Sequence, residues 1–137
     1  RRKIAPHEIV LFGESLGGAV AARLAARTAP RALVLASTLT SVPDLGAQVY
    51  PFLPVRWISR YSYDSLAALK AVKAPVLVAH SRDDDIVPFS HGRRLFEAAA
   101  GPKGFLEMRG GHNDGFIFMR REWVAELAAF LERSAAK

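Results

Sequence analysis

The sequence predicts an α/β fold, with a mainly parallel sheet and helices packed on it. Short apolar runs alternate along the chain with longer segments in which apolar residues recur at helical spacing. Strands separated by helices form βαβ units, and such units build parallel sheets. The 137 residues, half of them hydrophobic, also suit one folded core, so we expect residues 1–137 to form a single domain.

Four apolar runs predict four strands. Strands of a parallel sheet are buried on both faces, so they are typically near-continuous apolar runs rather than alternating ones. Three runs have this character, and the fourth alternates and ends at a glycine pair. The runs are EIVLFG at 8–13, ALVLAS at 32–37, PVLVAH at 75–80 and FLEMR at 105–109.

The segments between and after these runs predict four helices. The first is rich in alanine and ends shortly before Pro30, and the third is followed by a Gly-Pro pair. In the last, Trp123, Leu127, Phe130 and Leu131 form one apolar stripe at helical spacing. The helices are expected at 16–27, 65–72, 89–100 and 120–134.

Residues 38–73 interrupt the alternation of strands and helices. They contain three prolines and a group of aromatic residues, which favours short helices and turns inserted over the sheet as a small helical cap within the domain. The aromatic side chains can serve to pack this cap or to line a pocket for an apolar acyl or leaving group. The aromatic residues are Tyr50, Phe52, Trp57, Tyr61 and Tyr63. Candidates for substrate binding among them are Tyr50, Phe52 and Trp57.

The composition excludes several classes of function. The net charge is +6, but the arginines are scattered, and no zinc-finger spacing or RNA-binding sheet motif is present. We therefore expect a solvated basic face and no nucleic-acid partner. No apolar run approaches the roughly 18 residues that span a bilayer, and no signal peptide opens the chain. We expect no membrane segment and a cytoplasmic location.

Metal and cofactor chemistry find little support in the sequence. Without cysteine the chain has neither disulfides nor thiolate chemistry. His80 lies near three aspartates, but no second histidine stands at ligand spacing, so we expect no metal. Residues 13–18 lack the spacing of a nucleotide-binding loop, and no cofactor is predicted.

Residues 13–18 read GESLGG and stand between the first predicted strand and the first helix. This is the G-x-S-x-G pattern of a nucleophile elbow in its strand–turn–helix context. Such a turn holds Ser15 in a strained backbone, and glycines two before and two after let strand and helix approach. The backbone N–H of Leu16 would stabilise an oxyanion. Glu14, next to the nucleophile, is a candidate substrate-binding residue.

An acid and a base follow two later strands. Asp83, Asp84 and Asp85 come after the third strand, where such residues cap a turn or orient a histidine. His112 follows the fourth strand and a pair of glycines. The order Ser, Asp, His, with each residue after a different strand, predicts a catalytic triad. We expect the remaining histidines, His7 and His91, to be surface or capping residues.

From about residue 7 to 130 the chain resembles the C-terminal half of an α/β-hydrolase, most closely the Bem46-like and serine-aminopeptidase-like branch. The resemblance rests on IVLFGESLGGAVAARLA, HSRDDDIVPFSHGRRLFEAA and GGHND. The branch pattern H-G-x-x-D-x-x-V-P implies that Asp84 is the catalytic acid, with Ser15 as nucleophile and His112 as base. It implies a serine hydrolase that cleaves a carboxylic ester or thioester through an acyl-enzyme, or a peptidase or amidase with the same triad.

Two departures from the pattern matter. Ser81 replaces the usual glycine, which we expect a strand end to tolerate. The strands that precede the nucleophile strand in the family, and the loop that supplies the second oxyanion-hole N–H, have no counterpart in the sequence. Strand 8–13 would then be an open apolar edge. This favours a second hypothesis, an incomplete hydrolase half that is inactive until an N-terminal segment, a partner strand or a second copy pairs with 8–13.

Overall fold

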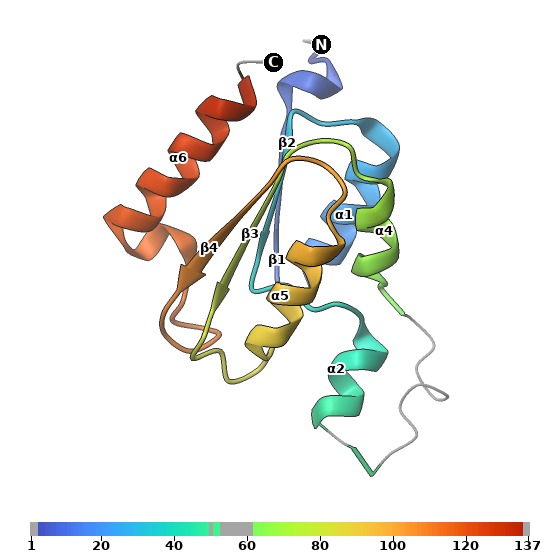
Figure 1. The fold of residues 1–137 in the computed structure, drawn as a ribbon, viewed down its shortest axis with the longest axis vertical. Helices are drawn as coiled ribbons and strands as arrows, with labels where there is room; N and C mark the ends of the chain where they lie inside the picture. Colours follow the sequence, from blue (N-terminus) through green and yellow to red (C-terminus); the bar gives the residue numbers. More distant parts are fainter. Residues whose placement is uncertain (1–2, 50, 53–61, 136–137) are drawn as a thin grey trace.

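The computed structural model describes residues 3–49, 51–52 and 62–135. Its centre is a four-stranded sheet in which every neighbouring pair of strands is parallel, in the order β1-β2-β3-β4 (Figure 1). The strands are β1 (Val10–Glu14), β2 (Ala32–Ala36), β3 (Val76–Ser81) and β4 (Lys103–Met108). The predicted parallel α/β sheet is confirmed, and each predicted strand end lies within two residues of the observed one.

Helices cover both faces of the sheet (Figure 1). Three helices lie on one face and α6 lies on the other. They are α1 (Leu16–Thr28), α4 (Ser65–Ala71), α5 (Phe89–Ala98) and α6 (Arg121–Ala135). Three further elements complete the described chain, namely η1 (Pro6–Glu8), α2 (Val42–Val49) and η2 (Ile117–Met119). Because helices shield both faces, the two central strands are buried throughout, as their apolar sequences predict.

The core consists of two apolar layers, one on each side of the sheet. Successive side chains of a strand point to opposite faces, so Leu33 and Leu35 of β2 pack under α1 and α4, whereas Val34 packs toward α6. On α6 the buried residues Trp123, Leu127 and Phe130 form the predicted stripe. The small side chains of α1 let it lie close to the sheet.

The described part of the segment 38–73 contains two helices in different settings. α2 lies beyond the carboxyl ends of the strands, at the bottom of Figure 1, far from both termini. In contrast, α4 packs against α1, and Leu69 and Val72 are fully buried in the core. α4 therefore belongs to the helical layer of the domain, and a cap-like role stays a prediction for the part of the segment that precedes it.

Each of the two outer strands, β1 and β4, has one edge that pairs with no other strand of the described residues. Within the described ranges β1 pairs with β2 alone, as expected for strand 8–13. Phe12 of β1 is 41% exposed, and its ring contacts that of Phe118.

Among the helices that the structure describes, none combines the length and apolar character needed to cross a bilayer.

Candidate active site

Ser15 occupies the sharp turn between β1 and α1. Its N–H donates to the carbonyl of Ala36 at 2.9 Å, which continues the β1–β2 pairing up to the turn. The backbone then bends with φ 50° and ψ −123°, a conformation that is costly for a residue with a Cβ. Leu16 is the first residue of α1, so its N–H has no acceptor within the helix.

Two glycines allow this turn to form. One is Gly13, which the pattern suggests, and the other is Gly18 rather than Gly17. A Cβ on Gly13 would lie 2.5 Å from the Cα of Gly18, and one on Gly18 would lie 2.0 Å from Oγ1 of Thr38. A Cβ on Gly17 would meet no atom of the described residues within 4 Å. The expectation that Gly17 permits the close approach is therefore wrong, and Gly18 takes that part.

The structure brings Ser15, His112 and Asp84 together, although 97 residues separate the first two in the sequence. Nε2 of His112 lies 3.1 Å from Oγ of Ser15, and its Nδ1 lies 2.9 Å and 3.1 Å from the two carboxylate oxygens of Asp84. A carboxylate only accepts hydrogen bonds, so Nδ1–H donates to Asp84, and Nε2 is left to accept the proton of the serine hydroxyl. The three residues follow the carboxyl ends of β1, β3 and β4.

The carboxylate of Asp84 is buried and densely hydrogen-bonded. Its side chain has no exposed surface, and its Oδ1 accepts the N–H groups of Ile86 and Val87 at 3.0 Å and 2.7 Å. Burial alone would raise the pKa of Asp84, but the hydrogen bonds from His80, His112 and these two amides outweigh it and lower the pKa to about 2. Asp84 is therefore an anion at neutral pH.

The two neighbouring aspartates hold the histidine loop. Oδ1 of Asp85 accepts the backbone N–H of His112 at 2.8 Å, and Oδ2 of Asp83 accepts the N–H of Gly110 at 3.3 Å. Ser81 adds a third link, since its Oγ donates to the carbonyl of Gly110 at 2.6 Å and accepts the N–H of Asp83 at 3.1 Å. Ser81, which we expected only to be tolerated at the strand end, thus links the loop that contains Asp84 to the loop that contains His112.

The chain was compared with protein families, with curated proteins and with solved structures. No family model matches the chain. Over 131 residues it is 44% identical to uncharacterized protein Rv2307c of Mycobacterium tuberculosis, with 95% of this chain and 47% of that protein covered. Over 139 residues it is 32% identical to human alpha/beta hydrolase domain-containing protein 17B, with 97% and 44% covered. The chain belongs to the α/β-hydrolase superfamily.

A solved structure supports the superfamily fold. Acetyl xylan esterase from Paenibacillus sp. R4 superimposes with a TM-score of 0.73 at 21% identity, over 97% of this chain and 47% of that one. This likeness concerns the fold alone. The chain spans about half the length of the curated relatives it matches. The curated relatives confirm the assignment of the chain to the α/β-hydrolase superfamily, whereas the Bem46-like or serine-aminopeptidase-like branch stays a prediction.

Of the four candidate substrate-binding residues of this α/β-hydrolase chain, the structure describes two, Glu14 and Phe52. Glu14 is half-buried beside Ser15; burial raises its pKa, and the nearby charge of His112 opposes that shift. Phe52 is 79% exposed. Tyr50 and Trp57 lie outside the described residues, as does Tyr61. Their role in binding substrate stays a prediction.

The prediction that His91 is a surface or capping residue is wrong. This side chain of α5 is fully buried, and its Nδ1 accepts the backbone N–H of Thr40 at 3.0 Å. Its Nε2 lies 3.0 Å from Oε1 of Gln48 on α2. Burial lowers the pKa of His91, and the positive charge of Arg94 acts in the same direction. His91 therefore joins α5 to the segment that carries α2. The adjacent Gly92 marks a different contact, since a Cβ there would meet His80 of β3.

Replacing Asp84 with asparagine is expected to flatten the acid dependence of stability. In the unfolded chain the carboxyl has a pKa near 3.8, and in the folded chain about 2, so the unfolded state takes up the proton first as the pH falls. This carboxylate therefore stabilises the fold above pH 4 by on the order of 2 kcal/mol, a contribution lost between about pH 4 and pH 2. Urea unfolding from pH 2 to pH 5 measures the loss.

The matched control is Glu107→Gln. Glu107 also has a lowered pKa, chiefly because of its hydrogen bond from Arg82, but this pair is solvent-exposed. Exposed pairs contribute little to stability, so this variant should keep most of the wild-type pH dependence. An Asp84→Asn protein with the full wild-type slope would contradict the buried, hydrogen-bonded state of the carboxylate.

Proposed function

We propose that this chain carries the catalytic triad of a serine hydrolase that acts by acyl transfer. The observation that carries the proposal is the unbroken series of contacts from Oγ of Ser15 to Nε2 of His112, and from its Nδ1 to Asp84. Nucleophile, base and orienting acid stand at hydrogen-bond distances, which is the arrangement that activates a serine hydroxyl.

In the proposed mechanism Oγ of Ser15 attacks a carbonyl carbon while its proton passes to Nε2 of His112. The negative charge on the former carbonyl oxygen is stabilised by the N–H of Leu16, at the positive end of α1. The protonated His112 then gives its proton to the leaving oxygen or sulfur, and the bond to the leaving group breaks. Water, deprotonated by His112, attacks the acyl-enzyme, and the acid product leaves as Ser15 recovers its proton.

A carboxylic ester or thioester with an apolar acyl part is the proposed substrate. One exposed apolar side chain follows each member of the triad, namely Leu16 after Ser15, Ile86 after Asp84 and Phe116 after His112. Between 40% and 44% of each is exposed, so an apolar group bound beside the serine would cover surface that water now contacts. A peptide or amide with the same triad is the alternative within this chemistry. Matched acyl esters and anilides separate the two.

The proposal is tested by labelling with a fluorophosphonate probe, which forms a covalent bond with activated serines. Digestion and mass spectrometry should place the adduct on the peptide that contains Ser15. Prior heat denaturation should abolish labelling, because the activation depends on contacts between three distant loops. An adduct on another serine, or equal labelling of the denatured chain, would contradict the assignment.

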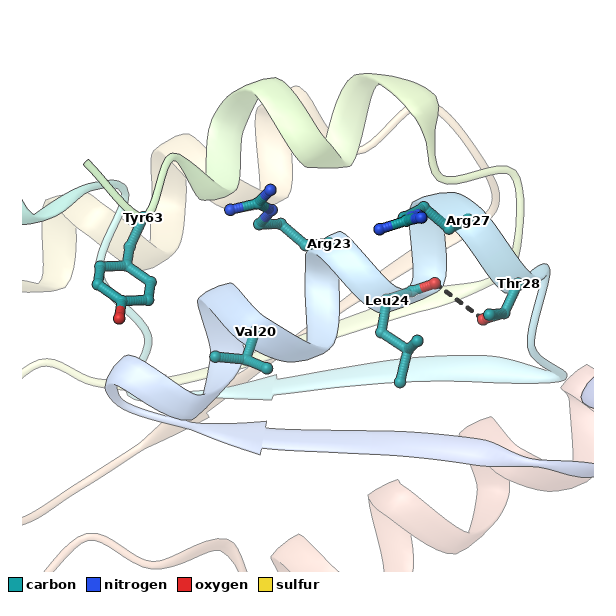
Figure 2. Close-up of a pocket in the computed structure, with 6 residues that line it drawn as sticks. All are labelled: Val20, Arg23, Leu24, Arg27, Thr28 and Tyr63. Carbon is teal, nitrogen blue, oxygen red and sulfur yellow. Dashed lines mark hydrogen bonds between the residues drawn. The ribbon is translucent and has the colours of Figure 1, made fainter. Parts of the chain in front are cut away.

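The open edge of β1 supports a second candidate, a hydrolase half that works only when a further polypeptide strand pairs with β1. Unpaired strand edges bind other strands readily. α1 beside it exposes Val20 and Leu24, by 56% and 45%. Together with Arg23, Arg27, Thr28 and Tyr63 these residues line an open groove of about 560 Å³, and Figure 2 shows that most of its lining comes from α1. The matched relatives have about as many residues outside the match as within it, enough to supply such a strand.

Introducing a charge into this groove tests the second candidate. In a longer polypeptide that contains this chain, Val20→Lys should lower the melting temperature by several degrees, because a covered valine cannot accept a lysine charge. In the 137-residue chain alone the same change should have almost no effect. Val124→Lys, at a 39% exposed site on α6, is the control. A chain that is monomeric alone and labels at the rate of the longer polypeptide would overturn this candidate.

A further inference from the structure

His80 lies directly behind the acid of the triad, and the proposed mechanism leaves it without a role. It is the fifth residue of β3 and is fully buried. Its Nε2 lies 2.8 Å from the carbonyl oxygen of Val87 and 3.4 Å from Oδ2 of Asp84, whose side chain is also fully buried. An imidazole in this position contacts both the catalytic carboxylate and the backbone of the loop that carries it.

The contacts determine which ring nitrogen carries the proton. A carbonyl oxygen only accepts hydrogen bonds, so Nε2–H is the donor to Val87, and in the neutral imidazole Nδ1 then carries no proton. Nδ1 is buried and has no hydrogen-bond partner among the residues that the structure describes. It faces α5, where a Cβ on Gly92 would lie only 2.6 Å away. The ring is thus oriented with its single N–H toward the acid loop.

His80 is linked to Asp84 through the backbone of Val87. Val87 donates its N–H to Oδ1 of Asp84 and accepts Nε2–H of His80 on its carbonyl, so both polar groups of this backbone unit are used. The ring of Phe89, at the start of α5, packs edge-on against His80 at a centroid distance of 6.1 Å. Held between β3, the loop and α5, the imidazole has little room to turn.

We propose that His80 is a positioning residue, which holds the Asp84 carboxylate and its loop so that both carboxylate oxygens face Nδ1 of His112. The inference rests on the proposed serine hydrolase function. His80 does not contact the reacting atoms and acts only through Asp84. Without its N–H, the carbonyl of Val87 would lose its donor and Oδ2 of Asp84 would lose the polar contact at 3.4 Å, so Asp84 would be free to rotate away from His112.

Two substitutions separate the donor from the volume of the ring. His80→Gln can place an amide N–H near the position of Nε2, whereas His80→Leu has a similar size and no donor. For each variant the rate of reaction with a fluorophosphonate is measured per folded molecule, with the folded fraction taken from circular dichroism. We expect the rate to fall about 10–100-fold for His80→Leu and to stay within about threefold of wild type for His80→Gln.

A second measurement requires no catalytic activity. The Nδ1–H proton of His112, hydrogen-bonded to a carboxylate, should give a low-field proton NMR signal. That signal should move upfield in His80→Leu, stay in place in His80→Gln and vanish in His112→Gln, which assigns it. A role limited to stability would change the folded fraction and leave the signal of the folded molecules unchanged. If no protein reacts with the probe, the proposed function fails, and the signal still tests the positioning.

The inference is overturned if His80→Leu keeps both the wild-type labelling rate and the wild-type signal, or if His80→Gln and His80→Leu lose them equally. Should His80→Leu fail to fold, His80→Asn replaces it. The shorter amide of asparagine sits near Nδ1, on the side of Gly92, and its N–H points away from Val87. This variant keeps a polar group in the site but should lower the labelling rate and move the NMR signal upfield, as His80→Leu would.

Discussion

Replacing Ser15 with alanine is expected to lower kcat for a carboxylic ester by about 10⁴–10⁶-fold and to leave KM little changed. The alanine keeps the backbone of the turn and removes only the oxygen that lies 3.1 Å from His112. No acyl-enzyme can then form, and the remaining rate comes from water near the oxyanion site. Steady-state hydrolysis of a chromogenic ester, measured in the most active polypeptide that contains this chain, gives both constants.

Ser134→Ala is the matched control for this substitution. Its hydroxyl donates to the carbonyl of Phe130 within α6, far along the chain from the triad. This substitution also removes one serine hydroxyl, but at a site away from the triad, so kcat should stay within about twofold of wild type. Comparable activity in Ser15→Ala and Ser134→Ala would show that another group performs the reaction.

Replacing Gly13 with alanine is expected to destabilise the fold by at least about 3 kcal/mol. The added Cβ would lie 2.5 Å from the Cα of Gly18 and 2.6 Å from the carbonyl oxygen of Gly17. Both are backbone atoms, so relief requires α1 to move away from β1 rather than a side chain to rotate. Urea unfolding, followed by circular dichroism, gives the change in the free energy of unfolding.

Gly17→Ala provides the control within the same turn. Its Cβ would meet none of the described atoms within 4 Å, and alanine favours the helix by up to about 1 kcal/mol. This variant should therefore be as stable as wild type or slightly more so. If Gly17→Ala were the more damaging of the two, the packing of α1 on β1 would differ from the one observed.

Sequence patterns were enough to predict the sheet and its main helices, and they also name the three residues of the proposed triad. Each of these depends on local signals, such as the apolar run of β3, the turn around Ser15 and the histidine that follows two glycines. The choice of Asp84 among three adjacent aspartates came from the family pattern. The contact of its carboxylate with His112 agrees with that choice.

The remaining features depend on contacts between distant segments. His91 and His80 are polar residues in apolar or helical surroundings, and their burial depends on Thr40 and Val87, which no local pattern joins to them. The requirement for Gly18 arises from Thr38, twenty residues away. Such pairs become visible only when the tertiary fold is known, because a side chain's neighbours across a sheet follow from topology rather than spacing.

The order of the strands has a consequence for heat inactivation. Ser15 follows one edge strand of the sheet and His112 follows the other, β1 and β4, with two strands between them. At about 4.8 Å per strand the base must reach back across roughly 14 Å to meet its nucleophile. A loop that spans such a distance opens at a lower free energy than the core unfolds. Warming would therefore disconnect the histidine while the sheet is still intact, and inactivation would precede melting.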